Sequence, residues 1–369
     1  MKKKCIFHIP NHVNPKAISG SNVRPMKMLQ AFQNIGYDVE VIMGYGKERK
    51  EQIKKIKQNI KKGVKYDFLY SESSIMPTLL TEKNHFPLYP NLDFGFFKFC
   101  KKNGIKIGLF YRDIQWKFKM YRDCVPIYKR CFSIPMYRYD LYRYKKLLHK
   151  FYLTSLGVEN HLKEYPKLIE KMDILPPGCD EVVLNKKNKD IVKTDAKIHI
   201  FYVGGICQIY NLEMFLEGVQ SIPEIEMIIC CRETEWKKEK ERYKKYLTPQ
   251  IKIVHASGEE LKAYYQWADI CCAFAGKGDY MSMAMPIKVF EYLGYGKPII
   301  GTKGTESGKF IEENGIGWNI GYDLQELKKS MLDIVKNPEI ICYKQKNIEH
   351  IREQHFWTSR ATKVSVDLS

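Results

Sequence analysis

The sequence contains no apolar run long enough to cross a bilayer. A membrane-spanning helix needs about 20 predominantly apolar residues, and charged side chains interrupt every apolar stretch of the 369 residues before that length is reached. The first residues are basic, but the apolar run that follows, residues 5–9, is too short for the core of a signal peptide. We therefore expect a cytoplasmic protein without an integral membrane segment, in which residues 5–9 form the first strand.

Motifs for several ligand classes are also missing. The sequence has neither a GxGxxG nor a GK[S/T] motif, which disfavours dinucleotide-binding dehydrogenases and P-loop enzymes. Its 11 cysteines are spread along the chain, and the adjacent pairs at 230–231 and 271–272 lack the two-residue gap of a zinc knuckle. We expect reduced cysteines in the core and no metal site.

Acidic residues are scarce in the first half of the chain. Residues 1–180 carry 34 Lys and Arg against 16 Asp and Glu, whereas residues 181–369 carry 27 against 26. This asymmetry indicates an anionic partner of the first half, such as nucleic acid, a phospholipid surface or a phosphorylated substrate. For residues 48–65 a solvated lysine-rich helix is favoured instead, because Ile53, Ile56 and Ile60 repeat at helical spacing.

Both halves alternate short apolar runs with helical patterns, which is typical of parallel βαβ units. Strands are expected at residues 5–9, 38–44, 66–72, 106–113, 150–155, 198–205, 226–232, 251–257, 269–275, 297–303 and 316–320. The polar segment 175–197 begins with Pro and Gly and marks a boundary. The sequence predicts an α/β protein of two doubly wound, Rossmann-like domains facing each other across a cleft. These are residues 1–178 and 179–345, with a C-terminal helical segment, 346–369, that packs back on the first domain.

The strongest functional pattern is PIKVFEYLGYGKPIIG, residues 286–301. If Pro286 starts a helix, Lys288 lies in its first turn and Glu291 follows on nearly the same face. A lysine there opposes the helix dipole, which favours a bound anion such as a diphosphate, and Glu291 would accept hydrogen bonds from ribose hydroxyls. The alternative is an exposed ion pair between the two side chains.

A second pattern is YVGGI, residues 202–206, where Gly204 and Gly205 follow a buried strand. Glycines at this position let the backbone turn tightly and approach a phosphate. A plain turn between a strand and a helix explains the same residues, so this pattern alone is weak.

These patterns resemble a known family. PxKxFEYLxxGKPII, the preceding YYQWADICCAF and the strand followed by Gly-Gly are similar to the donor-binding domain of nucleotide-sugar glycosyltransferases with the GT-B fold. SGSNVRPMKMLQAFQNIGYDVEVI and DILPPGCD also occupy the places expected for bacterial capsule, exopolysaccharide and lipopolysaccharide enzymes. The resemblance implies a hexosyltransferase that uses a UDP- or GDP-sugar and a glycan or lipid-linked acceptor.

The resemblance also implies a donor site. Gly204 and Gly205 would lie beside the diphosphate, whose charge Arg232 and Lys288 would neutralise. Glu291 would hold the ribose, and the base would lie near His255, Ala256 and Ser257. The sequence has no DxD triplet, so we expect a metal-independent enzyme without a cofactor. Many retaining members carry a second acid where this chain has Met283, and the stereochemical outcome stays open.

Acceptor contacts are expected in the first half. The loop at residues 11–24 contains Ser21 and Arg24 as candidates, while Glu72 and Asp113 end predicted strands, beyond which ligands of parallel sheets bind. The family places a catalytic carboxylate or histidine in this region, so Asp113 is the expected base if the enzyme inverts. A salt bridge between Asp113 and Arg112 is the alternative.

Residues 115–150 combine ten Lys and Arg with interleaved Tyr, Trp and Phe. This composition suits the inner face of an anionic membrane, although a single-stranded nucleic acid groove or a partly buried aromatic core uses the same residues. Together with the donor motifs, we expect a peripheral membrane enzyme that does not bind nucleic acid. The alternatives are a nucleotide-sugar 2-epimerase of the same fold and a nucleic-acid-binding protein.

Overall fold

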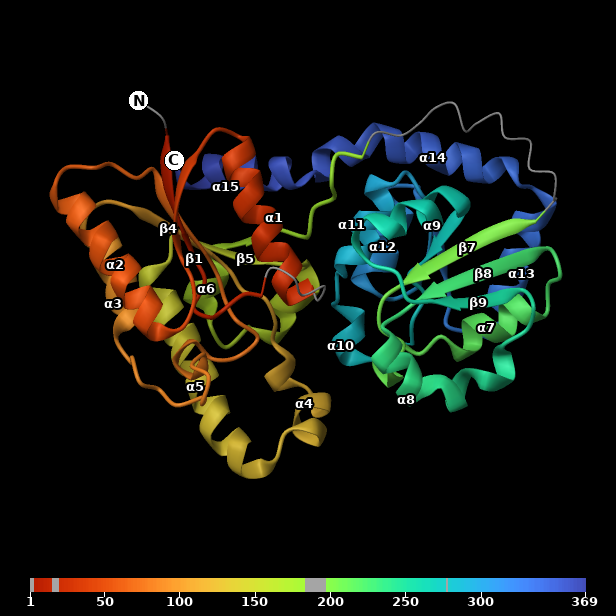
Figure 1. Cartoon of the computed structure of the whole chain (residues 1–369), viewed down its shortest axis with the longest axis horizontal. Coiled ribbons are helices and arrows are strands. Elements are labelled where there is room, and N and C mark those ends of the chain that lie inside the picture. Colours follow the sequence, from red (N-terminus) through yellow and green to blue (C-terminus); the bar gives the residue numbers. More distant parts are fainter. Residues whose placement is uncertain (1–2, 15–19, 183–196, 277) are drawn as a thin grey trace. The chain divides into compact units, whose positions relative to one another are not determined.

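The computed structural model describes residues 3–14, 20–182, 197–276 and 278–369 (Figure 1). The chain divides into two compact units: Met1–Pro177 together with Trp357–Ser369, and Gly178–Phe356. Most of the expected boundary segment, 175–197, lies outside the described residues. The segment expected at 346–369 is divided between the units, because the chain joins the first unit only from Trp357 onward.

The first unit contains a six-stranded parallel sheet with the order β2-β1-β3-β4-β5-β6. Its strands are β1 (Lys4–His8), β2 (Asp38–Ile42), β3 (Phe68–Glu72), β4 (Lys106–Phe110), β5 (Lys150–Leu153) and β6 (Met172–Ile174). Its helices are α1 (Gly20–Asn34), α2 (Gly46–Lys61), α3 (Leu92–Lys102), α4 (Lys119–Cys124), α5 (Ile127–Leu147), α6 (Pro166–Ile169) and α15 (Trp357–Leu368).

Helices cover both faces of this sheet because successive strand residues point to opposite sides. Phe7 of β1 lies in the core that α1 and α15 close, and these two helices lie side by side in Figure 1. The next residue, His8, faces α3, where its ring centroid lies 4.9 Å from that of Phe97. The predicted amphipathic helix at 48–65 is confirmed as α2, with Ile53 and Ile56 buried.

The second unit contains another six-stranded parallel sheet, with the order β12-β11-β10-β7-β8-β9. Its strands are β7 (Ile198–Val203), β8 (Ile225–Cys230), β9 (Ile251–Val254), β10 (Ile270–Cys272), β11 (Ile299–Thr302) and β12 (Gly317–Ile320). Its helices are α7 (Glu213–Gln220), α8 (Glu233–Tyr243), α9 (Leu261–Trp267), α10 (Asp279–Ser282), α11 (Ile287–Gly294), α12 (Glu306–Glu313), α13 (Leu324–Lys336) and α14 (Glu339–Ile351).

The same alternation builds two cores in the second unit. Ile200 and Tyr202 of β7 pack in one core with α7 and α13, and Phe201 between them packs in the other with α9 and α11. The predicted α/β fold with two doubly wound sheets is confirmed.

Several sequence expectations concern features outside the sheets. In the described part of the chain, no helix combines the length and the apolar character that a membrane span requires. All 11 cysteines are free thiols, and most of them are buried. The aromatic residues of the basic stretch 115–150 are divided: five are buried in the core of the unit, namely Trp116, Phe118, Tyr121, Tyr137 and Tyr144.

Candidate functional site

Lys288 lies under the glycine turn that ends β7. Helix α11 begins after Pro286, whose extended backbone (φ −67°, ψ 144°) forms the N-cap, and this places Lys288 in the first turn. Its half-buried side chain brings Nζ to 3.9 Å from the centroid of the Tyr202 ring and 5.4 Å from that of Tyr210. A Cβ atom on Gly204 would lie 3.4 Å from the same Nζ, in ordinary van der Waals contact, so the ammonium lies directly against this glycine.

The electrostatic environment of Lys288 is that of an ammonium partly shielded from water. Burial lowers the pKa of Lys288 from 10.5 to about 8, and the charge of Glu291 opposes this shift only in part. A bound anion would raise the pKa again, because an opposite charge favours the protonated form. The side chain is therefore suited to bind an anion.

The glycine turn itself is held by a carboxylate that the sequence analysis missed. Glu235 of α8 accepts hydrogen bonds from the backbone N–H groups of Ile206 (2.9 Å) and Cys207 (3.0 Å). A Cβ atom on Gly205 would lie 3.1 Å from its Oε1, and Gly204 has φ +144°, a conformation that favours glycine. Two amides of this turn are therefore bonded to Glu235, and the Nζ of Lys288 lies against its Gly204.

Arg232, assigned to the diphosphate, and the three residues assigned to the base lie at the ends of the neighbouring strands. Arg232 is exposed and forms the N-cap of α8, directly after β8. His255 follows β9, and its Nδ1 donates to the carbonyl of Cys231 at 2.8 Å. The carbonyl of Ala256 accepts from the thiol of Cys230 (3.3 Å), and Ser257 caps the turn that follows. Sheet order thus places His255, Arg232 and Gly204 along one edge, at β9, β8 and β7.

A pocket lies beside Lys288, at the carboxyl ends of β10 and β11. Small and apolar side chains form most of its wall: Ala273, Ala275, Met281, Ala284 and Pro286. Glu291 lies one turn further along α11 and is half-buried. The second unit therefore brings the two predicted residues of the strongest pattern, Lys288 and Glu291, onto one helix next to a pocket.

Glu72 of the first unit is the counter-charge of two arginines. Its carboxylate is fully buried, at 0% exposure. Oε1 lies 3.4 Å from Nε of Arg24, and Oε2 accepts from Nη2 of Arg112 at 2.9 Å. The guanidinium of Arg24 also stacks 3.5 Å from the centroid of the Phe110 ring. In this arrangement Glu72 holds Arg24 and Arg112, and its own oxygens do not reach the surface.

Asp113 is half-buried in the segment after β4. Its Oδ1 accepts a hydrogen bond from the backbone N–H of Gln115 at 2.9 Å, which fixes the turn that follows the strand. Ser21 lies in the first turn of α1, and its side chain falls outside the described part of the structure.

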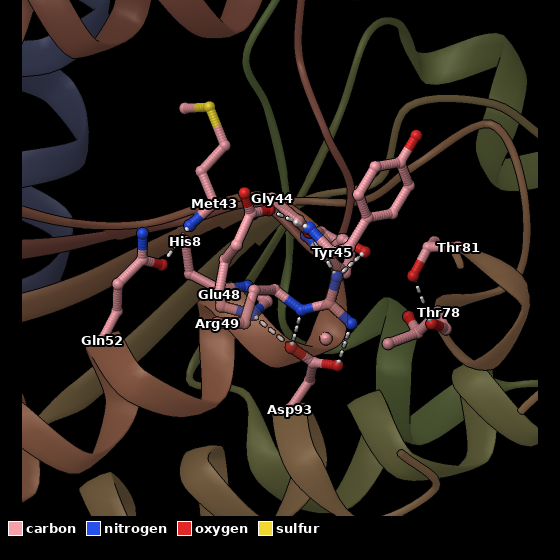
Figure 2. A network of polar contacts seen from close by, with 12 residues as sticks. His8, Met43, Gly44, Tyr45, Glu48, Arg49, Gln52, Thr78, Thr81 and Asp93 are labelled. Atoms are coloured by element: carbon pink, nitrogen blue, oxygen red, sulfur yellow. Dashed lines mark hydrogen bonds and ion pairs between the residues drawn. The ribbon is translucent and has the colours of Figure 1, made fainter. Parts of the chain in front are cut away.

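A buried charged network near the same edge of the first sheet was not predicted (Figure 2). Nε2 of His8 lies 2.9 Å from Oδ1 of Asp93, and Arg49 donates to both oxygens of Asp93, at 3.0 and 3.2 Å. Nη1 of Arg49 also donates to the carbonyls of Pro10 (2.7 Å) and Gly44 (2.6 Å). The network ties the loops after β1 and β2 to α3.

The protonation states in this network follow from burial and pairing. Burial lowers the pKa of His8, although Asp93 partly counteracts this effect. For Asp93 burial acts in the opposite direction, but His8 and Arg49 together hold its pKa below the ordinary value. The network therefore contains a neutral His8 beside the ion pair of Asp93 and Arg49. Its role is structural, because it holds the loops after β1 and β2 in place.

Among the residues that the structure describes, no group of three or more His, Cys, Asp or Glu side chains is placed to hold a metal ion.

Comparisons with known proteins identify the fold. Residues 197–337 match the family model described as Glycosyl transferases group 1. No curated protein sequence matches the chain. A sucrose-phosphate synthase from Thermosynechococcus elongatus shares 14% identity with a TM-score of 0.65, covering 99% of this chain and 98% of that one.

Two further solved structures are similar over nearly their whole length. Anabaena HepE in complex with UDP shares 11% identity (TM-score 0.68), and WaaG, a glycosyltransferase involved in lipopolysaccharide biosynthesis, shares 12% (TM-score 0.62). In both cases 99% of each chain is covered. The expected GT-B fold is confirmed, and with the matched domain it supports a glycosyltransferase enzyme.

Proposed function

We propose that this protein transfers a hexosyl group from a nucleotide-diphosphate sugar to a glycan or lipid-linked acceptor in bacterial surface polysaccharide synthesis. The observation that carries the proposal is Lys288, a half-buried cation of lowered pKa under the Gly204 turn of the matched domain. HepE has been solved with UDP and with UDP-glucose, and WaaG is involved in lipopolysaccharide biosynthesis. These relatives favour a UDP-sugar donor and a surface glycan product.

In this proposal the diphosphate binds between Lys288 and Arg232. Both cations stabilise the negative charge that develops on the leaving nucleoside diphosphate, which is the role a metal ion has in other transferases. Glu291 accepts hydrogen bonds from the ribose hydroxyls, and the base lies near His255, Ala256 and Ser257. The reaction then requires no cofactor and no metal.

Asp113 is the proposed base on the acceptor hydroxyl if the enzyme inverts configuration. The hydrogen bond from Gln115 holds one carboxylate oxygen at 2.9 Å, so the second oxygen is oriented by the same turn. Arg24, held by Glu72, and Ser21 are the proposed acceptor-side residues.

The proposed membrane surface comprises α4, the first turns of α5 and the two residues that join them. Ile127, Tyr128 and Phe132 are 69%, 69% and 46% exposed there, next to the exposed Arg122 and Lys129. Apolar side chains would enter the headgroup region while the cations meet anionic lipid, each contributing about 1 kcal/mol. We propose that the protein is cytoplasmic and peripheral on the inner face of the cell membrane, where a lipid-linked acceptor is found.

The proposal is tested by thermal shift with UDP, GDP, dTDP and ADP, followed by calorimetry. A nucleoside diphosphate at 100 times its dissociation constant should stabilise the folded protein by about 2.7 kcal/mol. Lys288→Ala should abolish most of this stabilisation, while Lys329→Ala, an exposed lysine on α13, should leave it unchanged. If none of the four nucleotides stabilises the protein, the donor site is assigned wrongly.

A further inference from the structure

Helix α5 holds the segment that follows β3 through three of its side chains. Tyr137 donates a hydrogen bond to the carbonyl of Ile75 (2.7 Å). One turn further along the helix, Oδ2 of Asp140 accepts from the backbone N–H of Thr78 (2.7 Å). The hydroxyl of Tyr144 lies 3.0 Å from Oγ1 of Thr78. Because these side chains are spaced by three and four residues, they share one face of α5, and this face fixes the segment.

Asp140 is a buried carboxyl group with only one of its oxygens hydrogen-bonded. The residue is 3% exposed, and its Oδ1 has no hydrogen-bond partner among the described residues. Arg143, three positions further along α5, donates to the hydroxyl of Tyr139 instead (2.7 Å). An ionised carboxylate at this place is therefore buried without a paired cation, which costs free energy.

The other titratable groups around Asp140 do not supply a counter-charge. The negative charge of Asp93, on α3, disfavours ionisation of Asp140. Burial raises the pKa of the hydroxyls of Tyr111, after β4, and of Tyr144, so both stay neutral. For Asp140 itself, burial raises the pKa from 3.8 to about 7, although the hydrogen bonds from Thr78 act in the opposite direction. The carboxyl group therefore changes its charge close to neutral pH.

We propose that Asp140 is a pH-sensitive switch, which holds the segment after β3 against α5 while its carboxyl group is protonated and releases the segment when the group ionises. The ionised form still accepts the N–H of Thr78, but its charge lies in a space closed to water. Opening the contact admits water to both oxygens and so favours the ionised form. The switch itself is independent of the proposed function.

The released segment begins at residues that hold Arg112. Ser73 directly follows β3, and its Oγ accepts the backbone N–H of Arg112 (2.9 Å), while its carbonyl accepts from Nε (3.1 Å). Arg112 precedes Asp113, the proposed base. Ionisation of Asp140 therefore loosens the acceptor side of the first unit. Only this consequence rests on the proposed function.

The expected size of the effect follows from proton linkage. The closed contact binds the proton of Asp140 with a pKa of about 7, whereas in the open segment the group returns to its ordinary pKa of 3.8. The closed form thus holds more protons, and it loses stability as the pH rises toward and through 7. Between pH 6 and pH 8 the ratio of open to closed molecules increases about tenfold, and above about pH 8 it changes no further.

Hydrogen exchange at the Thr78 amide of the full chain tests the proposal. Corrected for the intrinsic pH dependence of exchange, its protection factor should fall about tenfold between pH 6 and pH 8. Asp140→Asn keeps an oxygen that accepts the Thr78 N–H but cannot ionise, so the protection factor should change by less than about twofold. The matched Asp123→Asn removes an exposed carboxylate of α4 and should retain the wild-type response.

Two results would overturn the switch. A wild-type protection factor at Thr78 that stays constant or rises between pH 6 and pH 8 would do so without any variant. An equal fall in the wild type and in Asp140→Asn would assign the pH response to another group. Because exchange is measured instead of sugar transfer, either result leaves the proposed function untouched, and a failure of the proposed function leaves this test valid.

Discussion

Raising the pH from 7 to 9 should weaken the binding of a nucleoside diphosphate, because Lys288 loses its proton in this range. Burial brings the pKa of Lys288 down to about 8 in the ligand-free protein. The ammonium is then protonated in roughly nine tenths of the molecules at pH 7 and in roughly one tenth at pH 9. If only the protonated form binds the diphosphate, the apparent dissociation constant rises about tenfold. A lysine with its ordinary pKa would remain charged throughout.

Whether binding takes up or releases protons gives an independent check on the role of Lys288. The bound diphosphate raises the pKa of Lys288, so binding at pH 8 takes up roughly half a proton from the solvent. Phosphate itself has completed its second ionisation, near pH 6, before this range begins. Calorimetry at pH 8 in two buffers of different ionisation enthalpy measures the uptake directly.

Lys288→Arg is the matched control because a guanidinium keeps its charge up to pH 9. Its affinity at pH 7 should be lower, since the larger group fits the space under Gly204 less well, but the change between pH 7 and 9 should disappear. A wild-type affinity that is constant over this range, or a release of protons at pH 8, would refute the reasoning.

Four further predictions concern other parts of the molecule. Glu235→Ala should loosen the glycine turn and weaken nucleotide binding about tenfold, because two loop amides lose their acceptor, whereas an unchanged affinity in calorimetry would exclude this role. Arg49→Ala should lower the free energy of unfolding by about 3–5 kcal/mol, since it leaves Asp93 buried without its main partner. Urea denaturation measures this loss. The control is Lys50→Ala, an exposed position at which the free energy of unfolding should change by less than about 0.5 kcal/mol. Transfer activity should persist in EDTA, and a loss that Mn²⁺ or Mg²⁺ restores would contradict the metal-independent mechanism. Replacing Tyr128 and Phe132 by Ser should reduce co-sedimentation with anionic vesicles, while nucleotide affinity stays the same. Vesicle binding that does not depend on lipid charge or on salt concentration would contradict the membrane role.

The sequence predicts most of the sheet strands because each is a short apolar run, and in β1, β3, β7 and β8 most residues are buried. Strand β6 is not predicted from the sequence. Its three residues are all half-buried, and Asp173 at its centre pairs with Lys363 at 2.7 Å. Only the folded chain brings that partner close, so no local pattern marks the strand.

In the candidate site too, some residues can be predicted from the local sequence and others cannot. Lys288 and Glu291 are predicted because a single helix carries both, whereas Glu235 is one of several charged residues in the local run ETEWKKEKERY and nothing distinguishes it. The partners of Asp93 are 85 and 44 positions away, at His8 and Arg49. In the basic aromatic stretch, composition alone does not separate buried Tyr137 from exposed Tyr128.

Because α15 belongs to the first unit, the core of that unit is completed late during synthesis on the ribosome. Trp357, Ala361, Val364 and Leu368 complete the core around β1, yet the whole second unit, Gly178–Phe356, is translated before them. At about 5–20 residues per second, that unit takes roughly 10 to 40 s to emerge. Throughout this interval the nascent N-terminal unit exposes the apolar surface that α15 later covers. The unit made first therefore completes its core only after the second unit has been made, and chaperones have that surface available until α15 emerges from the ribosome.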